Sequence, residues 1–459
     1  MLVTRKLFLA GIFFIQAVVT YFALMQQFPA SGDDYSYLYQ AKLFATGKLY
    51  ASDPLYDTRH PLHDCVETSC LTDDHGHRFS RYPPGWPALL AIGAKLGVPW
   101  LVNPFLGATL LLLMLVFVEQ RLGEKLTGVT YLLMGLCFFL CYYAASFRSH
   151  IASALCVFAA FFVYEAVERR QSLSNFWLVG AGALLGYSTM IRYIDCIALG
   201  AWIGVSLLAR KKITGLTLFV LGFGLLASGN LIYNMLLSGD PLQNFKADHL
   251  TVSWKGFEVT GLRLANCIWV FPPVLLLIVF WKYCKESPNI KMYSGLFLMN
   301  VAVYFFYTVA VGGPGPRYLL TYFPFIVLAA VDLYRWICRN GSPVARYLWR
   351  FAIVSEIVGS LVFAAVQGYT TYWRRDMERT VQRTGGAKRI VFLKTGTYRT
   401  SVGDLTRNPP VLSSANSLFV SWCDEPKRTA LLRVFSDRNA FVYEYPGRIS
   451  PYASFASAQ

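Results

Sequence analysis

Apolar runs of about twenty residues recur along most of this chain of 459 residues. A helix needs about 20 apolar residues to cross the ~30 Å hydrocarbon core of a bilayer. Hydrophobic residues make up 55% of the chain and charged residues only 15%, whereas about 25% of the residues of a soluble globular protein are charged. The runs therefore indicate a polytopic α-helical membrane protein and exclude a soluble, disordered or small disulfide-stabilised one.

The runs predict eleven transmembrane helices. The first is expected to be a retained anchor rather than a cleaved signal peptide, because its apolar stretch exceeds a usual signal core. The two helices that flank Arg192 are short, so we expect a broken or strongly tilted pair there. The predicted spans lie at about 7–25, 101–118, 127–145, 150–167, 175–190, 194–209, 213–237, 264–281, 293–311, 318–335 and 350–368.

The positions of Lys and Arg predict the orientation of these helices, because cytoplasmic loops carry an excess of both. With the N-terminus inside, the cytoplasmic connections hold sixteen Lys and Arg residues. The three shortest outer connections hold one each: Arg148, Arg192 and Arg317. We therefore expect the N-terminus inside and the C-terminus outside. Much of the net charge of +16 follows from this topology. Because the basic residues form no single patch, no nucleic-acid partner is expected.

Two segments lie outside the membrane in this topology. The first outer loop, about residues 26–100, is too long to be a simple connection. The tail, residues 370–459, is expected to form a small extracytoplasmic α/β domain after a transmembrane domain at 1–369. Its patterns predict strands at Arg389–Lys394, Ser417–Trp422 and Ala440–Tyr445 and a helix at Pro426–Phe435.

Two of the ten cysteines, Cys65 and Cys70, stand close together in the first outer loop. Disulfides persist outside the cytoplasm, so one expectation is a short-range bridge between them. Two free thiols are the alternative. Most of the other cysteines lie in apolar spans, where buried thiols are expected.

Adjacent carboxylates, Asp33 and Asp34, follow the first span directly. One interpretation is a helix N-cap, because Asp satisfies the free N–H groups at a helix start. The other is a general base or metal ligand held at the membrane surface. A single Asp is enough for a cap, so the pair gives weight to the functional interpretation.

Further motifs follow on the same outer side. They are Arg81–Pro87 (Arg-Tyr-Pro-Pro-Gly-Trp-Pro), Asn230–Asn234 with the turn at Ser238–Leu242, and Gly312–Leu320 (Gly-Gly-Pro-Gly-Pro-Arg-Tyr-Leu-Leu). Together with the Asp33–Asp34 pair, and in this order, they resemble the GT-C membrane glycosyltransferases. The resemblance is to the protein-mannosyltransferase and aminoarabinose-transferase-like branch.

This resemblance implies an integral membrane enzyme of GT-C fold that takes a sugar from a polyprenyl-phosphate carrier on the outer face. The partners it implies are this lipid-linked sugar, membrane lipid and an acceptor that is a lipid, a glycan or a protein. An acidic residue of the first loop is essential in the family, and its usual Asp-Glu pair falls on Asp33-Asp34. The aminoarabinose-type enzymes have Lys before the paired prolines, where this chain has Tyr82.

Sugar transfer from such a donor needs an activated hydroxyl and cations that stabilise the leaving phosphate. We assign Asp33 as the base and Asp34 as its partner. Guanidinium groups match phosphate oxygens, and the donor-phosphate candidates are Arg81, Tyr82, Arg192, Arg317 and Tyr318. A divalent metal is a further candidate cofactor, with Asp34 and His150 as ligands. The alternatives are that Arg192 is a snorkelling anchor and that His150 is a packed or capping residue.

Three other functions compete with this hypothesis. A lipid or lipid-linked sugar flippase or transporter shares the span count, but it predicts functional charge near the membrane midplane. A non-catalytic scaffold predicts that Asp33 and Asp34 are replaceable. A nucleic-acid role is disfavoured by the charge distribution. The ionisable residues crowd one outer surface, so we expect a glycosyltransferase of a bacterial inner membrane with its site on the periplasmic side.

Overall fold

The computed structural model describes residues 2–29, 31–169, 174–242, 254–307, 315–384, 388–394, 406–444 and 447–452. Gly312–Pro314 of the Gly/Pro-rich motif lie outside these residues. The chain divides into two compact units. We call Met1–Leu24, Pro83–Trp86 and Trp100–Gln367 the helical unit, and Met25–Tyr82, Pro87–Pro99 and Gly368–Gln459 the loop–tail unit.

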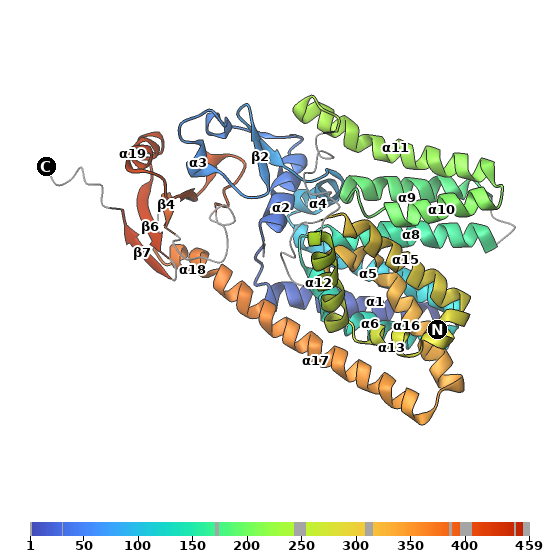
Figure 1. The fold of residues 1–459 in the computed structure, drawn as a ribbon. Helices are drawn as coiled ribbons and strands as arrows, with labels where there is room; N and C mark the ends of the chain where they lie inside the picture. Colours follow the sequence, from blue (N-terminus) through green and yellow to red (C-terminus); the bar gives the residue numbers. More distant parts are fainter. Residues whose placement is uncertain are drawn as a thin grey trace. The chain divides into compact units, whose positions relative to one another are not determined.

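The helical unit consists of apolar helices (Figure 1). Among the described residues, six helices are long and apolar enough to cross a membrane, or eight spans if each of two bent pairs counts as one. The bend between α6 (Thr127–Gly135) and α7 (Phe138–Ala145) is 67°, and that between α12 (Trp254–Val270) and α13 (Pro273–Val279) is 107°. The chain is therefore a polytopic helical membrane protein.

Ten of the eleven predicted spans overlap an apolar helix or one of the bent pairs, and the one at 293–311 overlaps the helix Pro288–Phe305. As expected, the helices that flank Arg192 are short and apolar: α9 (Trp177–Ile191) and α10 (Ile197–Ala209). The count of eleven crossings stays a prediction. The remaining helices of the unit are α1 (Leu2–Val19), α5 (Val102–Arg121), α8 (His150–Arg169), α11 (Ile213–Ser238), α14 (Trp281–Glu286), α15 (Pro288–Phe305), the 3-10 helix η6 (Arg317–Tyr322), α16 (Phe323–Asn340) and α17 (Pro343–Arg374).

Glycines bring α9 and α11 into backbone contact, and the two helices run side by side in Figure 1. A Cβ atom at Gly182 would lie 2.0 Å from the carbonyl oxygen of Phe219, and one at Gly222 would lie 2.1 Å from that of Val179. Helices in lipid associate through such close approach of small residues. This packing fixes the end of α9, where Arg192 follows.

The loop–tail unit contains two sheets. The first-loop sheet is antiparallel with strand order β1-β3-β2, a feature that the sequence patterns did not indicate. The tail sheet has the order β5-β4-β6-β7, in which β4 is parallel to β5 and β6, and β7 is antiparallel to β6. The predicted tail strands and helix are confirmed. The elements are α2 (Gly32–Ala45), β1 (Ala51–Ser52), α3 (His63–Val66), β2 (Leu71–Asp74), β3 (His77–Ser80), α4 (Gly85–Lys95), α18 (Asp376–Gln382), β4 (Arg389–Lys394), β5 (Ser417–Ser421), α19 (Glu425–Val434), β6 (Asn439–Glu444) and β7 (Arg448–Pro451).

The first loop and the tail share one hydrophobic core. Tyr39 and Tyr56 of the loop are buried in the same cluster as Phe392 and Leu418 of the tail. The structure thus groups most of the loop with the tail. The division into domains at 1–369 and 370–459 is not tested by this grouping and stays a prediction.

The expected bridge between Cys65 and Cys70 is wrong. Cys65, on α3, forms a disulfide with Cys423, which follows β5, and their Cα atoms are 5.7 Å apart. Cys70 is a free thiol. The reason is that Cys65 packs into the shared core, whereas the sulfur of Cys70 faces the first turn of α2 and bonds to Asp33 there.

Candidate active site

The Asp33–Asp34 pair occupies the first turn of α2, but neither residue is its N-cap. Ser31 is the N-cap, and its hydroxyl accepts from the Asp34 amide at 3.3 Å. The same hydroxyl donates to Asp34 Oδ2 at 2.7 Å, and Asp34 is completely buried. Asp34 is therefore bonded to the helix start, and its role as the partner of Asp33 stays a prediction. Carboxylates in a first turn also interact favourably with the helix dipole.

Asp33 lies among hydrogen-bond donors from the end of the first loop. The Tyr82 hydroxyl donates to Asp33 Oδ1, and the Cys70 thiol donates to the same oxygen at 3.4 Å. The Arg81 guanidinium lies 3.2 Å from Cys70 Sγ. The Tyr82 ring stacks on that of Tyr37, with centroids 4.7 Å apart. The structure therefore brings together three residues that the sequence nominated, Asp33, Arg81 and Tyr82.

Both donors keep their protons at neutral pH. Burial and the negative charge of Asp33 raise the pKa of the Tyr82 phenol well above its usual value. The same two causes raise the pKa of the Cys70 thiol to about 11. A protonated phenol and a protonated thiol each offer a hydrogen to a carboxylate, so Tyr82 and Cys70 act on Asp33 as neutral hydrogen-bond donors.

A network of hydroxyl and amide groups places these residues against α2. The Ser36 hydroxyl donates to the Cys70 carbonyl at 2.6 Å and lies 2.8 Å from the Ser80 hydroxyl. Gln40 Oε1 accepts from the Ser80 amide at 2.8 Å. Ser36 and Gln40 follow Asp33 on the same helix, so the helix that carries the carboxylate also positions its donors.

The Arg81–Pro87 motif continues into the helical unit. Trp86 is completely buried there and donates from its indole nitrogen to the Phe147 carbonyl at 2.6 Å. A Cβ atom at Gly85 would lie 2.7 Å from the Met190 carbonyl oxygen, so only glycine fits. Within this unit the motif therefore packs against the end of α9, two residues before Arg192.

A second cluster lies in the helical unit around Asp195, which is completely buried. Arg192 Nε donates to Asp195 Oδ2 at 3.0 Å, so these two residues form an ion pair. The hydroxyl of Ser153 donates to the same oxygen at 2.8 Å. The hydroxyls of Tyr304 and Thr321 also donate to this carboxylate.

The ring of Tyr318 is surrounded by guanidinium groups. The centres of the Arg263 and Arg317 groups both lie 4.8 Å from the ring centroid, and that of Arg192 lies 5.7 Å from it. Arg317 also donates to the Tyr318 hydroxyl at 2.9 Å. The structure thus places Arg192, Arg317 and Tyr318, the three residues predicted to bind the donor phosphate in this region, in one cluster. It adds Arg263, whose only sequence signal was a basic residue on the predicted outer side.

Arg263 is buried and anchored by backbone groups. Its two terminal nitrogens donate to the carbonyls of Tyr304 at 2.6 Å and Tyr307 at 2.8 Å. His150 is also buried, and neither ring nitrogen has a hydrogen-bond partner among the described residues. The guanidinium groups of Arg148, Arg192 and Arg317 are close enough to its imidazole to interact with it electrostatically.

The two candidate metal ligands, Asp34 and His150, belong to different units of the structure. Asp34 belongs to the loop–tail unit and is bonded to Ser31, whereas His150 belongs to the helical unit. Across the described ranges, no group of three or more His, Cys, Asp and Glu side chains converges as a metal site requires. Metal binding by Asp34 and His150 stays a prediction, and we route no chemical step through it.

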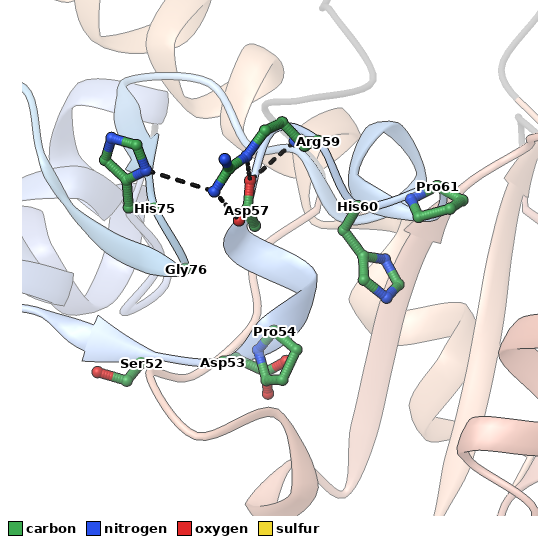
Figure 2. A pocket seen from close by; sticks show the side chains of 9 residues that line it. All are labelled: Ser52, Asp53, Pro54, Asp57, Arg59, His60, Pro61, His75 and Gly76. Atoms are coloured by element: carbon green, nitrogen blue, oxygen red, sulfur yellow. Dashed lines mark hydrogen bonds and ion pairs between the residues drawn. The ribbon is translucent and has the colours of Figure 1, made fainter.

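The first loop also contains an open cavity of about 600 Å³ that includes none of the nominated residues. Figure 2 shows Arg59 between Asp57 and His75 at its rim. Arg59 donates to Asp57 Oδ2 at 2.8 Å, and these bonds hold the pKa of the Asp57 carboxyl well below its usual value. Because Asp57 and Arg59 neutralise each other, we assign no chemistry to this cavity.

No protein-family model matches this chain, and no curated protein is detectably similar to it in sequence. Two solved structures are similar in fold. The first is ArnT from Cupriavidus metallidurans in the apo state, with a TM-score of 0.57 and 14% identity over 95% of this chain and 92% of that chain. The second is ArnT from the same organism bound to undecaprenyl phosphate, with a TM-score of 0.54 and 14% identity over 95% and 93%.

Proposed function

This chain has the fold of ArnT, a GT-C glycosyltransferase, and we propose that it transfers a sugar from a polyprenyl-phosphate donor to an acceptor. The acceptor is a lipid, a glycan or a protein. The observation that carries the proposal is the Asp33 carboxylate, held in a first-loop helix turn by a phenol and a thiol. The undecaprenyl phosphate bound to ArnT supports a polyprenyl-phosphate partner.

The proposed reaction divides the chemistry between the two clusters. Asp33 takes the proton of the acceptor hydroxyl, whose oxygen attacks the anomeric carbon of the sugar. The bond from that carbon to the phosphate oxygen breaks, and its electron pair leaves with the polyprenyl phosphate. Arg192, Arg317 and Tyr318 bind the phosphate, and preorganised cations of this kind stabilise charge that develops on a leaving group. Arg263 is a further residue that binds the phosphate. Arg81, also a phosphate candidate, lies next to Cys70 beside the proposed base.

The proposal includes the membrane setting. It places the chain in a bacterial inner membrane with eleven crossings, the N-terminus in the cytoplasm and the C-terminus outside. The acid–base site then lies on the periplasmic side. The tail at 370–459 is the extracytoplasmic domain that follows the membrane domain at 1–369.

The test is sugar transfer from a panel of labelled polyprenyl-phosphate sugars by the purified protein. We compare wild type with Asp33→Asn and with Asp74→Asn, an exposed carboxylate of the same loop. General-base removal costs about 10²–10⁴-fold in rate, so Asp33→Asn is expected to lose turnover by this factor and Asp74→Asn to keep it. Full turnover in a folded Asp33→Asn protein would contradict the assignment.

One observation favours the flippase as a second candidate. Glu356 of α17 is 1% exposed, and neither of its carboxyl oxygens has a hydrogen-bond partner among the described residues. Its charge acts on Cys137, at the bend between α6 and α7. Ionisable groups inside membranes and broken helices are features of transporters.

The flippase predicts that reconstituted protein moves a fluorescent polyprenyl-phosphate sugar across a vesicle membrane without transferring the sugar. Glu356→Gln removes the ionisable group at nearly constant volume and is expected to stop this movement. A Glu356→Gln protein that transfers sugar at the wild-type rate would support the glycosyltransferase.

A further inference from the structure

Cys70 and Tyr82 contact the same atom of the proposed base. The thiol and the phenol both donate to Asp33 Oδ1, and their own polar atoms are 3.5 Å apart. Two donors that converge on one carboxylate oxygen fix the rotation of the carboxyl group about its last bond.

The backbone at Cys70 is strained in a way that serves this contact. Cys70 has φ +65°, in the left-handed region that side chains other than glycine rarely adopt. Its carbonyl is held by the Ser36 hydroxyl at 2.6 Å and by the Arg81 amide at 3.4 Å. Strain of this kind persists where the surroundings impose it, often at functional sites. Here it turns the thiol toward α2.

The chemistry of the thiol matches a role as hydrogen donor. A thiolate, not a thiol, is the nucleophile in oxidation and disulfide exchange. Because the neighbouring carboxylate and burial keep the sulfur protonated, Cys70 is a poor nucleophile and remains a donor. Cys65, the nearest cysteine in the sequence, is already bonded to Cys423.

We propose that Cys70 is a positioning residue that acts with Tyr82 to hold the Asp33 carboxylate in the orientation from which it accepts the proton of the acceptor. This inference rests on the proposed function, in which Asp33 is the base. It assigns Tyr82, which the sequence nominated for phosphate binding, to the Asp33 carboxylate instead. It also assigns a role to Cys70, a free cysteine that the sequence linked only to a disulfide.

The kinetic test uses Cys70→Ala, Cys70→Ser and Tyr82→Phe, with Cys338→Ala, an exposed free cysteine, as the matched control. Misplacement of a reacting group by about 1 Å costs up to about 10²-fold in rate. We expect Cys70→Ala and Tyr82→Phe to lower kcat at least tenfold with KM within twofold of wild type. Cys70→Ser, whose hydroxyl also donates, is expected to regain most of kcat. Unchanged kcat in Cys70→Ala, or no recovery in Cys70→Ser, would overturn the proposal.

A second measurement does not depend on turnover. Asp33→Asn removes the charge that disfavours the Cys70 thiolate, so alkylation of Cys70 by a maleimide at pH 7.5 is expected to accelerate about tenfold. Asp74→Asn is expected to leave the rate unchanged. An unchanged rate in folded Asp33→Asn would overturn the contact itself. Accelerated alkylation in a protein that transfers no sugar from any donor would instead reject the proposed function, and with it the role of the contact in catalysis.

Discussion

The two clusters hold their carboxylates in opposite ways. Asp33 in the loop–tail unit accepts hydrogen bonds from a phenol and a thiol, which are neutral. Asp195 in the helical unit is completely buried and is paired with the Arg192 guanidinium. Asp33 also interacts electrostatically with Arg81, whereas Asp195 and Arg192 form a direct ion pair inside a network of hydroxyl donors. Under the proposed function, Asp33 is the carboxylate that transfers a proton, and Asp195 is the one that holds Arg192 in place.

The largest expected effect that tests this comparison is on stability. Removing one partner of a buried ion pair costs about 3–5 kcal/mol, because the other charge is left uncompensated. We therefore expect Asp195→Ala to lower the free energy of unfolding by about this amount and Asp33→Ala to lower it far less, as measured by denaturation of the purified protein in detergent. Equal losses in the two variants would remove the distinction between the clusters.

A smaller effect is expected on ligand binding. A hydrogen bond to a charged group contributes about 1.5–3 kcal/mol, so Arg317→Gln should weaken binding of polyprenyl phosphate by about 10–100-fold. Arg350→Gln, on the exposed side of α17, is the control and should bind as wild type does. Titration with a fluorescent polyprenyl phosphate measures both. If Cys70→Ala weakened binding as much as Arg317→Gln, the division between base and phosphate clusters would be wrong.

The smallest effect concerns pH. Burial and the Asp33 charge raise the pKa of Cys70 to about 11 from an ordinary value of 9.0. The folded protein therefore holds this proton more tightly than the unfolded chain, and the associated stability is present below pH 9 and is lost as the pH rises toward 11. Cys70 in the folded protein should react with maleimide more slowly at pH 8 than in the urea-unfolded chain. Equal rates would show that Asp33 does not act on the thiol.

Local patterns predicted much of this structure. The apolar runs located every span-forming helix, because burial in lipid demands one composition over a fixed length. Arg389–Lys394 and Glu425–Val434 of the tail were also found, since alternation and helical spacing are local signals. At the site, the motifs nominated Asp33, Arg81 and Tyr82 separately, and the structure places all three around Cys70.

Contacts between distant segments could not be predicted in the same way. The partner of Cys65 is 358 residues away, and no local spacing encodes such a pairing. Arg263 looked like an ordinary basic residue of a loop, yet it packs on Tyr318 because α12 crosses η6. The thiol of Cys70 reaches Asp33 only through an unusual backbone conformation, and residue patterns do not reveal that.

The bridge between Cys65 and Cys423 has a consequence for biosynthesis. The ribosome makes Cys65 early and Cys423 near the end, so the largest segment of the helical unit, Trp100–Gln367, is synthesised between the two. Until the tail has been synthesised, Cys65 of the first loop therefore remains unpaired and the hydrophobic core that the loop shares with the tail remains incomplete. The loop–tail unit can thus be completed only after the helices before the tail have been made. A chain truncated before Cys423 would leave Cys65 as an unpaired thiol that quality-control enzymes can capture.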